Sequence, residues 1–369
     1  MRTLILSGDT GEGHNSCAKA IEEYYISQGE ICKIEEGLQF ISPSFSRVIS
    51  GSHTFIYKYL PWLFRWGYNN TERHPNIFRE NALVYRMLAV GTERLYQYIN
   101  ENEYDRVICT HVFAALILSN VIKKYKVNLV TGLVLTDYTC YPGVKDCCLN
   151  YYFIPGKLLR NEFERADIAP EKIISSGIPV RRMFYEARDR KITDVCSSKS
   201  ANTKKLLLMC GSMGCGPITV LLEKLIAVRN ENWDITVVCG KNERLRRKLE
   251  KKYNRDKHIH IRGYVQNMAW LMGQADLYIT KPGGISVTEA AVEALPMLLF
   301  NTVAGCEEYN RTYFVENGGA RTGENLGELV ETCSLLMNDE ESLNSMHFHL
   351  KKLHEFDSAQ IIFEKMQEG

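Results

Sequence analysis

A histidine inside a glycine-rich loop is the first residue of the chain whose type and position could do chemistry. The sequence begins MRTLILSGDTGEGHN, so Gly8 and Gly13 have the spacing of a Walker A loop. Such a loop continues with lysine and then serine or threonine, which bind the phosphates and magnesium. His14 and Asn15 stand there instead. Because an imidazole is largely neutral at pH 7, the stretch predicts a base beside a glycine loop and disfavours an ATPase.

Two further glycine stretches have the residue types that bind phosphate. Gly211–Pro217 reads GSMGCGP and follows the apolar run KLLLMC. Backbone N–H groups in such a loop, at a helix N-terminus, suit phosphate, although a tight turn without a ligand explains the stretch equally well. In Ile279–Glu293, ITKPGGISVTEAAVE, the glycines end a strand and open a helix. Glu289 could there accept hydrogen bonds from both ribose hydroxyls, although acids are also favoured at helix starts.

A polar segment directly after the run PMLLF is a candidate sugar site. We predict Val303–Asn310 to be a loop, whose two carboxylates and amide would suit sugar hydroxyls; a solvated acidic turn is an equal alternative. No D-x-D sequence occurs in the chain. We therefore expect backbone amides and helix dipoles, without a metal, to stabilise a leaving diphosphate.

The elements that must position these residues alternate along the chain. Short apolar runs separated by helical stretches predict parallel sheets covered by helices on both faces, an α/β fold. We expect strands at Thr3–Ser7, Arg106–Thr110, Leu129–Leu135, Tyr151–Ile154, Lys205–Cys210, Ile235–Cys239, His258–Ile261, Leu277–Thr280 and Pro296–Phe300.

Strand, glycine loop and helix follow one another twice, near Gly8 and near Gly211. This repetition predicts two Rossmann-like domains facing across a cleft. We place the first at residues 1–187, followed by a polar linker at Arg188–Thr203, and the second at 204–354. A C-terminal helix at 355–369 could pack back on the first domain.

Composition excludes several classes of protein. The 369 residues carry a net charge of +1, without the basic excess of a nucleic-acid binder. The 12 cysteines include no C-x-x-C and no zinc spacing, so we expect free thiols in a reducing cytoplasm. No apolar stretch approaches the roughly 18 residues of a membrane span. The protein is expected to touch a membrane at most.

The most aromatic stretch, Phe55–Tyr68, reads FIYKYLPWLFRWGY and sets Trp62 and Trp66 beside Lys58 and Arg65. Tryptophans and tyrosines next to cations are typical of a surface that rests on lipid headgroups. The same rings could instead form part of the first domain's core.

Motifs in order along nearly the whole chain resemble one family of enzymes. SGDTGEGH, TDY at Thr136–Tyr138, SSGIPVRRMF at Ser175–Phe184, and ITKPGGISVTEA with PMLLF…GCEEYN resemble the bacterial diacylglycerol glucosyltransferases and the plant monogalactosyldiacylglycerol synthases. These belong with the peptidoglycan N-acetylglucosaminyltransferase among two-domain GT-B glycosyltransferases.

The resemblance implies an inverting transfer of a hexose from a UDP-sugar to a lipid hydroxyl, diacylglycerol or a related glycolipid. It implies peripheral association with the cytoplasmic face of the membrane, and no cofactor or metal. A UDP-sugar 2-epimerase and a non-catalytic nucleotide-sugar-binding protein are the alternatives.

The resemblance also implies roles for individual residues. His14 matches the loop histidine that acts as general base or orients the acceptor, and Asp9 or Asp137 could orient its ring. For the acceptor the candidates are Gly11, Gly13, Trp62 and Trp66. For the donor they are Gly211, Ser212 and Gly214 (phosphate loop), Tyr264 and Val265 (uracil), Lys281, Gly283, Gly284 and Ser286 (diphosphate), Glu289 (ribose), and Glu307, Glu308 and Asn310 (sugar).

The sequence departs from the family at two places. Cys306 stands where the family commonly has glutamine, which leaves the identity of the sugar open. Tyr138–Val144 lacks the histidine and tryptophan that relatives place after Thr136-Asp137, so the acceptor pocket is expected to differ.

Overall fold

The computed structural model describes residues 1–8, 12–42, 78, 82–193, 203–214, 216–302, 305–354 and 356–368. The chain forms two compact units. The first comprises Met1–Arg182, Ala304–Cys306 and Phe356–Gly369, and the second comprises Met183–Val303 and Glu307–Glu355. The units divide at Arg182 and Phe356, near the boundaries that we placed at residues 187 and 355.

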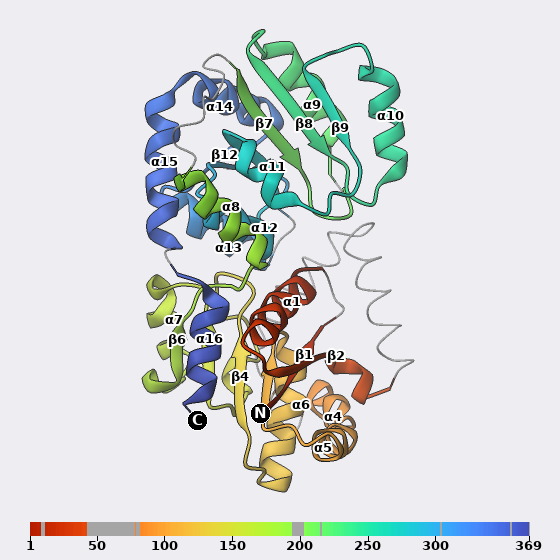
Figure 1. Ribbon diagram of the computed structural model, residues 1–369, viewed down its shortest axis with the longest axis vertical. Helices are drawn as coiled ribbons and strands as arrows, with labels where there is room; N and C mark the ends of the chain where they lie inside the picture. Colours follow the sequence, from red (N-terminus) through yellow and green to blue (C-terminus); the bar gives the residue numbers. More distant parts are fainter. Residues whose placement is uncertain are drawn as a thin grey trace. The chain divides into compact units, whose positions relative to one another are not determined.

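The first unit is built on a parallel sheet with the strand order β2-β1-β3-β4-β5-β6 (Figure 1). Leu4 and Leu6 of β1 belong to the core that α5 and α6 cover, and Ile5, on the opposite face, is buried as well. Burial on both faces explains the continuous apolar run. The strands are β1 (Arg2–Ser7), β2 (Ile31–Glu36), β3 (Arg106–Cys109), β4 (Val130–Val134), β5 (Tyr151–Ile154) and β6 (Ile173–Ser175). The helices are α1 (Glu12–Ser27), α4 (Leu83–Ala89), α5 (Thr92–Glu101), α6 (Val112–Tyr125), α7 (Arg160–Arg165) and α16 (Ser358–Gln367), with 3-10 turns η1 (Gly37–Phe40), η3 (Val144–Asp146), η4 (Lys157–Leu159) and η5 (Pro170–Lys172).

The second unit contains a parallel sheet with the order β12-β11-β10-β7-β8-β9. Counted from its own first strand, this is the 3-2-1-4-5-6 order of a dinucleotide-binding fold. The strands are β7 (Lys204–Met209), β8 (Trp233–Val238), β9 (Ile259–Arg262), β10 (Leu277–Thr280), β11 (Met297–Leu299) and β12 (Ala320–Thr322). The helices are α8 (Arg182–Thr193), α9 (Ile218–Val228), α10 (Glu243–Tyr253), α11 (Met268–Gln274), α12 (Gly284–Val292), α13 (Cys306–Glu316), α14 (Leu326–Asn338) and α15 (Glu340–Leu353).

The predicted α/β fold with two Rossmann-like sheets is confirmed. Three strands were not predicted, β2, β6 and β12, and all three lie at sheet edges. An edge strand has fewer buried residues, and none of the six residues of β2 (ICKIEE) is buried. Such strands therefore lack the apolar run by which the central strands were recognised.

Two loop predictions are wrong. The segment predicted as a linker from Arg188 is helical through Thr193, the end of α8. The segment predicted as a loop at Val303–Asn310 becomes helical at Cys306, where α13 begins. Glu307 and Glu308 lie in the first turn of α13, where the helix dipole favours acids, so the same carboxylates that indicated a polar loop are compatible with a helix start.

Helix α16 packs on α1 and β4 of the first unit (Figure 1). The ring of Phe363 lies 4.9 Å from that of Tyr25 and 5.5 Å from that of Tyr24, measured between centroids. Met366 is fully buried beside Gly132, where an added Cβ would lie 3.3 Å from the methionine sulfur. This helix, distant in sequence, therefore completes one face of the first sheet.

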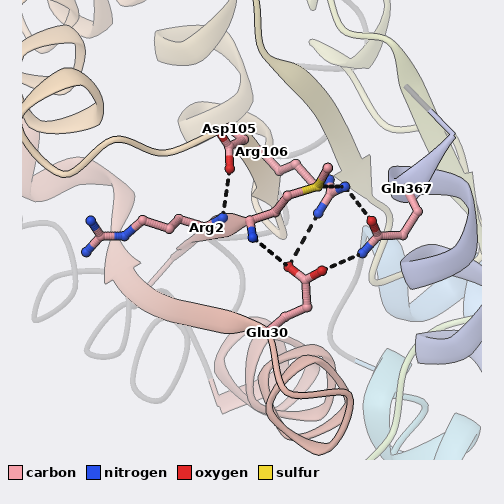
Figure 2. Close-up of polar contacts among 6 residues, drawn as sticks. Arg2, Glu30, Asp105, Arg106 and Gln367 are labelled. Carbon is pink, nitrogen blue, oxygen red and sulfur yellow. Dashed lines mark hydrogen bonds and ion pairs between the residues drawn. The ribbon is translucent and has the colours of Figure 1, made fainter.

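A polar cluster secures the end of α16 (Figure 2). Gln367 donates a hydrogen bond of 3.0 Å to Glu30 and accepts one from Arg106. The Arg106 guanidinium lies 3.5 Å from the Glu30 carboxylate, and its side chain is only 3% exposed. A nearly buried cation of this kind needs its partners, because an unpaired buried charge is strongly destabilising.

No described helix has the length and apolar content to cross a bilayer.

Replacing Met366 with alanine should lower the free energy of unfolding by about 2–5 kcal/mol, because it leaves a cavity between α16 and the sheet. The measurement is urea denaturation of the full chain. Gln360→Ala, an exposed position on the same helix, is the matched control and should change stability by less than about 0.5 kcal/mol. Equal stability of the two variants would contradict the packing of α16.

Candidate functional site

Each sheet has one place where the connections from two neighbouring strands run in opposite directions. It lies between β1 and β3 in the first sheet and between β7 and β10 in the second. Open α/β sheets bind ligands at this point, outside the carboxyl ends of the strands. The predicted catalytic histidine follows β1, and the two predicted phosphate loops follow β7 and β10. Sequence prediction therefore placed its principal candidates at the switch points.

His14 is held in one tautomer by the neighbouring strand connections. It lies in the first turn of α1, half-buried, with Nδ1 2.7 Å from the carbonyl oxygen of Thr110 and 3.2 Å from the hydroxyl of Thr136. A carbonyl oxygen only accepts hydrogen bonds, so Nδ1 carries the proton. In the neutral ring the basic lone pair is then on Nε2, which is the form needed to accept a proton.

A second histidine packs against the first. The ring of His111 meets that of His14 edge-on, with 4.7 Å between centroids and 71° between planes. His111 caps α6, where its Nδ1 accepts a 3.1 Å hydrogen bond from the backbone of Phe113. An added Cβ at Gly8 would lie 2.7 Å from the His111 ring, so glycine is required there. The absence of a side chain at Gly8 therefore leaves room for the His111 ring, which packs against His14.

The remaining first-unit candidates are only partly described. Gly13 precedes His14 in the first turn of α1, and Asp137 follows β4 and is half-buried. The contacts of the His14 ring described above come from Thr110 and Thr136, so the orienting role of Asp137 stays a prediction. Predictions on Asp9, Gly11, Trp62, Trp66 and the whole of Phe55–Tyr68 lie outside the described residues.

In the second unit the predicted phosphate loop after β7 lies directly on the turn after β8. Gly211 and Gly214 have φ angles of 68° and 55°, which favour glycine. An added Cβ at Gly214 would lie 2.1 Å from the carbonyl oxygen of Cys239, and one at Gly240 would lie 2.1 Å from that of Ser212. The two turns therefore approach as closely as backbone can, and Gly240 was not singled out from the sequence although it follows the run ITVVC.

The turn after β10 presents a helix N-terminus. Gly283 is the N-cap of α12 and forms no side-chain cap. An added Cβ at Gly283 would meet nothing within 4 Å, whereas one at Gly211 would lie 3.0 Å from Cε of Lys281. The side-chain direction at the N-cap of α12 is thus open, and Lys281, two residues earlier, reaches over Gly211. Amides and cation together suit an anion such as phosphate.

Ser286 and Glu289 lie half-buried on α12. Burial, and to a smaller extent the negative charge of Glu289 nearby, raise the pKa of the Tyr278 phenol on β10. Glu289 therefore lies in the neighbourhood of the buried Tyr278 side chain. The ribose-binding role of Glu289 stays a prediction.

The two acids and the amide predicted to face the sugar have different surroundings. Glu307 lies 2.9 Å from Nζ of Lys281, and the two side chains are 12% and 16% exposed. Asn310 is fully buried and donates a 3.0 Å hydrogen bond to the carbonyl oxygen of Pro282. Glu308 is exposed and pairs with Arg311. One face of α13 thus secures the Lys281–Pro282 turn, and Glu308 lies away from it.

The connection after β9 contains the two residues predicted to read uracil. Tyr264 is 61% exposed, with Nζ of Lys241 5.9 Å from its ring centroid. Val265 lines a pocket of about 260 Å³ together with Arg262, Asn267, Trp270 and Leu271. This pocket follows β9, and the two predicted phosphate loops follow β7 and β10. The three strands end at the same edge of the sheet, where they lie in the order β9, β8, β7, β10.

Among the described residues, no group of three or more histidine, cysteine, aspartate or glutamate side chains could hold a metal ion.

In comparisons with known proteins, two family models match the chain, one in each of its two units. Residues 14–180 match the family model of monogalactosyldiacylglycerol (MGDG) synthase, and residues 205–360 match that of the glycosyltransferase family 28 C-terminal domain. The processive diacylglycerol beta-glucosyltransferase of Bacillus subtilis is 27% identical over 98% of this chain and 94% of its own. That of Bacillus pumilus is 29% identical over 100% of this chain and 94% of its own.

Solved structures share the fold. MurG of Acinetobacter baumannii superposes with a TM-score of 0.66 at 14% identity, covering 100% of this chain and 99% of its own. The UDP-GlcNAc 2-epimerase of Neisseria meningitidis gives 0.64 at 14% identity, covering 100% of both chains. The chain therefore belongs to the glycosyltransferases of the GT-B fold, with an MGDG synthase domain in its first unit and a family 28 C-terminal domain in its second.

Proposed function

We propose that the protein transfers a hexose from a UDP-sugar to the hydroxyl of a lipid acceptor, diacylglycerol or a related glycolipid, with inversion at the sugar carbon. The reaction would take place at the cytoplasmic surface of the membrane. The observation that carries the proposal is the 2.7 Å contact of His14 Nδ1 with the Thr110 carbonyl, which assigns the basic lone pair to Nε2, in a domain matching the MGDG synthase family. Relatives named diacylglycerol beta-glucosyltransferase support the acceptor, and fold neighbours solved with UDP-GlcNAc or UDP support the donor.

The donor would lie along the carboxyl edge of the second sheet. The pocket beside Val265 would take the uracil, and Glu289 the ribose hydroxyls. The N-terminus of α12, with Gly283 as its cap and Lys281 beside it, would take the diphosphate. Helix dipole and ammonium would stabilise the charge that develops on the departing UDP, so no metal is needed in this proposal.

His14 would act as the general base. The acceptor hydroxyl gives its proton to Nε2 of His14 while its oxygen forms a bond to the sugar carbon. The bond between that carbon and the phosphate oxygen breaks, and UDP leaves with the electron pair. The hydrogen bond from Nδ1 to the Thr110 carbonyl persists through the transfer and stabilises the imidazolium that forms.

The donor and acceptor are tested together by incubating the protein with UDP-glucose, UDP-galactose or UDP-N-acetylglucosamine and diacylglycerol in vesicles. We expect one UDP-hexose to yield a glycolipid, detected by mass spectrometry, and EDTA to leave the rate unchanged. Vesicles without diacylglycerol are the control. A 2-epimerised UDP-sugar in the absence of lipid would instead support the epimerase alternative, and strict dependence on manganese or magnesium would contradict the metal-free leaving group.

Replacing His14 with alanine should lower kcat at least about a hundredfold, because a positioned base contributes about 10²–10⁴-fold. UDP affinity, measured by calorimetry, should be nearly unchanged. The unaltered enzyme should lose activity as the pH falls through about 6–7, where imidazoles ordinarily protonate.

His349→Ala, at an exposed position of α15, is the matched control and should keep full turnover. Nitrogen-15 NMR of the neutral ring should show Nε2 of His14 as the unprotonated nitrogen. Near-normal turnover of His14→Ala, or loss of UDP binding instead, would assign the histidine a structural role.

Replacing Glu289 with alanine should weaken UDP binding by about 1–3 kcal/mol, the usual range for hydrogen bonds to a charged group. Isothermal titration calorimetry measures the change directly. Glu331→Ala removes the same charge from an exposed position of α14 and should leave UDP affinity unaltered. Equal affinities of the two variants would remove Glu289 from the donor site.

A further inference from the structure

The ion pair between Lys281 and Glu307 joins two parts of the proposed donor site. Lys281 directly precedes the Pro282-Gly283-Gly284 turn, where the diphosphate is proposed to bind. Glu307 lies in the first turn of α13, which follows the neighbouring strand β11. Nζ and Oε1 are 2.9 Å apart, and both side chains are more than four-fifths buried. The same carboxylate therefore holds the lysine and occupies the position predicted to face the sugar.

Glu307 and Asn310 attach α13 to this turn in different ways. Three residues apart, they lie on one face of the helix. Asn310 is fully buried and donates a hydrogen bond to the backbone carbonyl of Pro282. The Lys281 side chain takes no part in this contact. The turn stays attached through Asn310 when Lys281 moves. Only the Glu307 contact depends on a flexible four-carbon stem.

We propose that the donor diphosphate and Glu307 compete for Lys281, so that donor binding exchanges one partner of the lysine for another. This inference rests on the proposed function and assigns the pair a role within it. Without nucleotide, Glu307 neutralises the ammonium. When a diphosphate binds at the N-terminus of α12, Lys281 pairs with it, because a diphosphate carries more negative charge than a carboxylate and the α12 amides add to its binding.

The exchange leaves a partly buried carboxylate that needs hydrogen bonds. In the donor complex the hydroxyls of the hexose would donate them, so Glu307 acts as a ligand of the sugar only while Lys281 is on the diphosphate. With UDP alone no hexose hydroxyl is present, so the separated carboxylate gains no hydrogen bond from the sugar. The pair therefore favours UDP-hexose over the product UDP and helps the product to leave.

Calorimetric titrations of the full chain with UDP, with uridine and with the UDP-hexose selected by the donor screen test this exchange. Glu307→Gln should bind UDP at least about threefold more tightly, because the competitor for Lys281 is removed, and the UDP-hexose at least about threefold more weakly. Product inhibition by UDP should strengthen accordingly. Affinity for uridine, which lacks phosphates, should not change.

Lys281→Gln should weaken UDP binding at least about tenfold without affecting uridine, and Lys281→Arg should retain most of the affinity. The double variant Lys281→Gln/Glu307→Gln should bind UDP more tightly than Lys281→Gln alone, since no uncompensated carboxylate then faces the diphosphate. Glu223→Gln and Lys252→Gln break a 2.6 Å ion pair between exposed side chains of α9 and α10 and serve as matched controls without effect.

If Glu307→Gln is folded by circular dichroism and binds UDP no more tightly than the unaltered protein, the exchange is wrong. If Glu307→Gln does not fold, the double variant decides, and UDP affinity equal to that of Lys281→Gln overturns the proposal. Failure of the unaltered protein to bind UDP would instead overturn the proposed donor itself.

Discussion

Parallel strand pairing is the constraint on which both candidate sites depend. It delivers the carboxyl ends of all strands in a sheet to one edge, so segments far apart in sequence end beside one another. Thr110 reaches the His14 ring in this way, across a separation of 96 residues, because β1 and β3 are neighbours. Lys281 passes over Gly211 for the same reason, since β10 pairs with β7. In each unit the strand order determines which segments meet at the candidate site.

The two switch points are equipped with opposite electrostatics. In the first unit the connections after β3 and β4 supply a carbonyl and a hydroxyl, groups without a formal charge that lie against Nδ1 of His14 and fix the tautomer of its neutral form. In the second unit the connections supply a helix N-terminus and an ammonium, both of which favour anions. In the proposed sugar transfer the first would serve as the proton acceptor and the second as the anion receptor. Each is built mainly from backbone groups, with few charged side chains added.

The sequence predicts the central strands well and the edges poorly. Strands β5 and β10 begin and end at the predicted residues. A strand that is buried on both faces consists of consecutive apolar residues, which the sequence shows directly. β2, β6 and β12 were missed, since an edge strand is not buried in that way. For the site, glycine spacing marked connections that follow β1, β7 and β10, and their ligands stay predictions. The partner of His14 could not be read from the sequence, because it is a backbone carbonyl, which every residue has. Asn310, predicted to bind the sugar, is buried and donates to the Pro282 carbonyl, a packing contact that residue type alone does not reveal.

Helix α16 has a consequence for the order in which the chain folds during synthesis. It completes the first sheet, yet some 170 residues separate Phe356 from Arg182, where the main segment of that unit ends. At a translation rate of about 5–20 residues per second, the face formed by Gly132 and Phe153 waits roughly 10–35 s for its cover. Nearly all of the second unit, its last helix α15 included, is synthesised within that interval. The N-terminal half of the protein is therefore the last to be finished, and the nascent chain exposes an uncovered apolar face on which a chaperone can act.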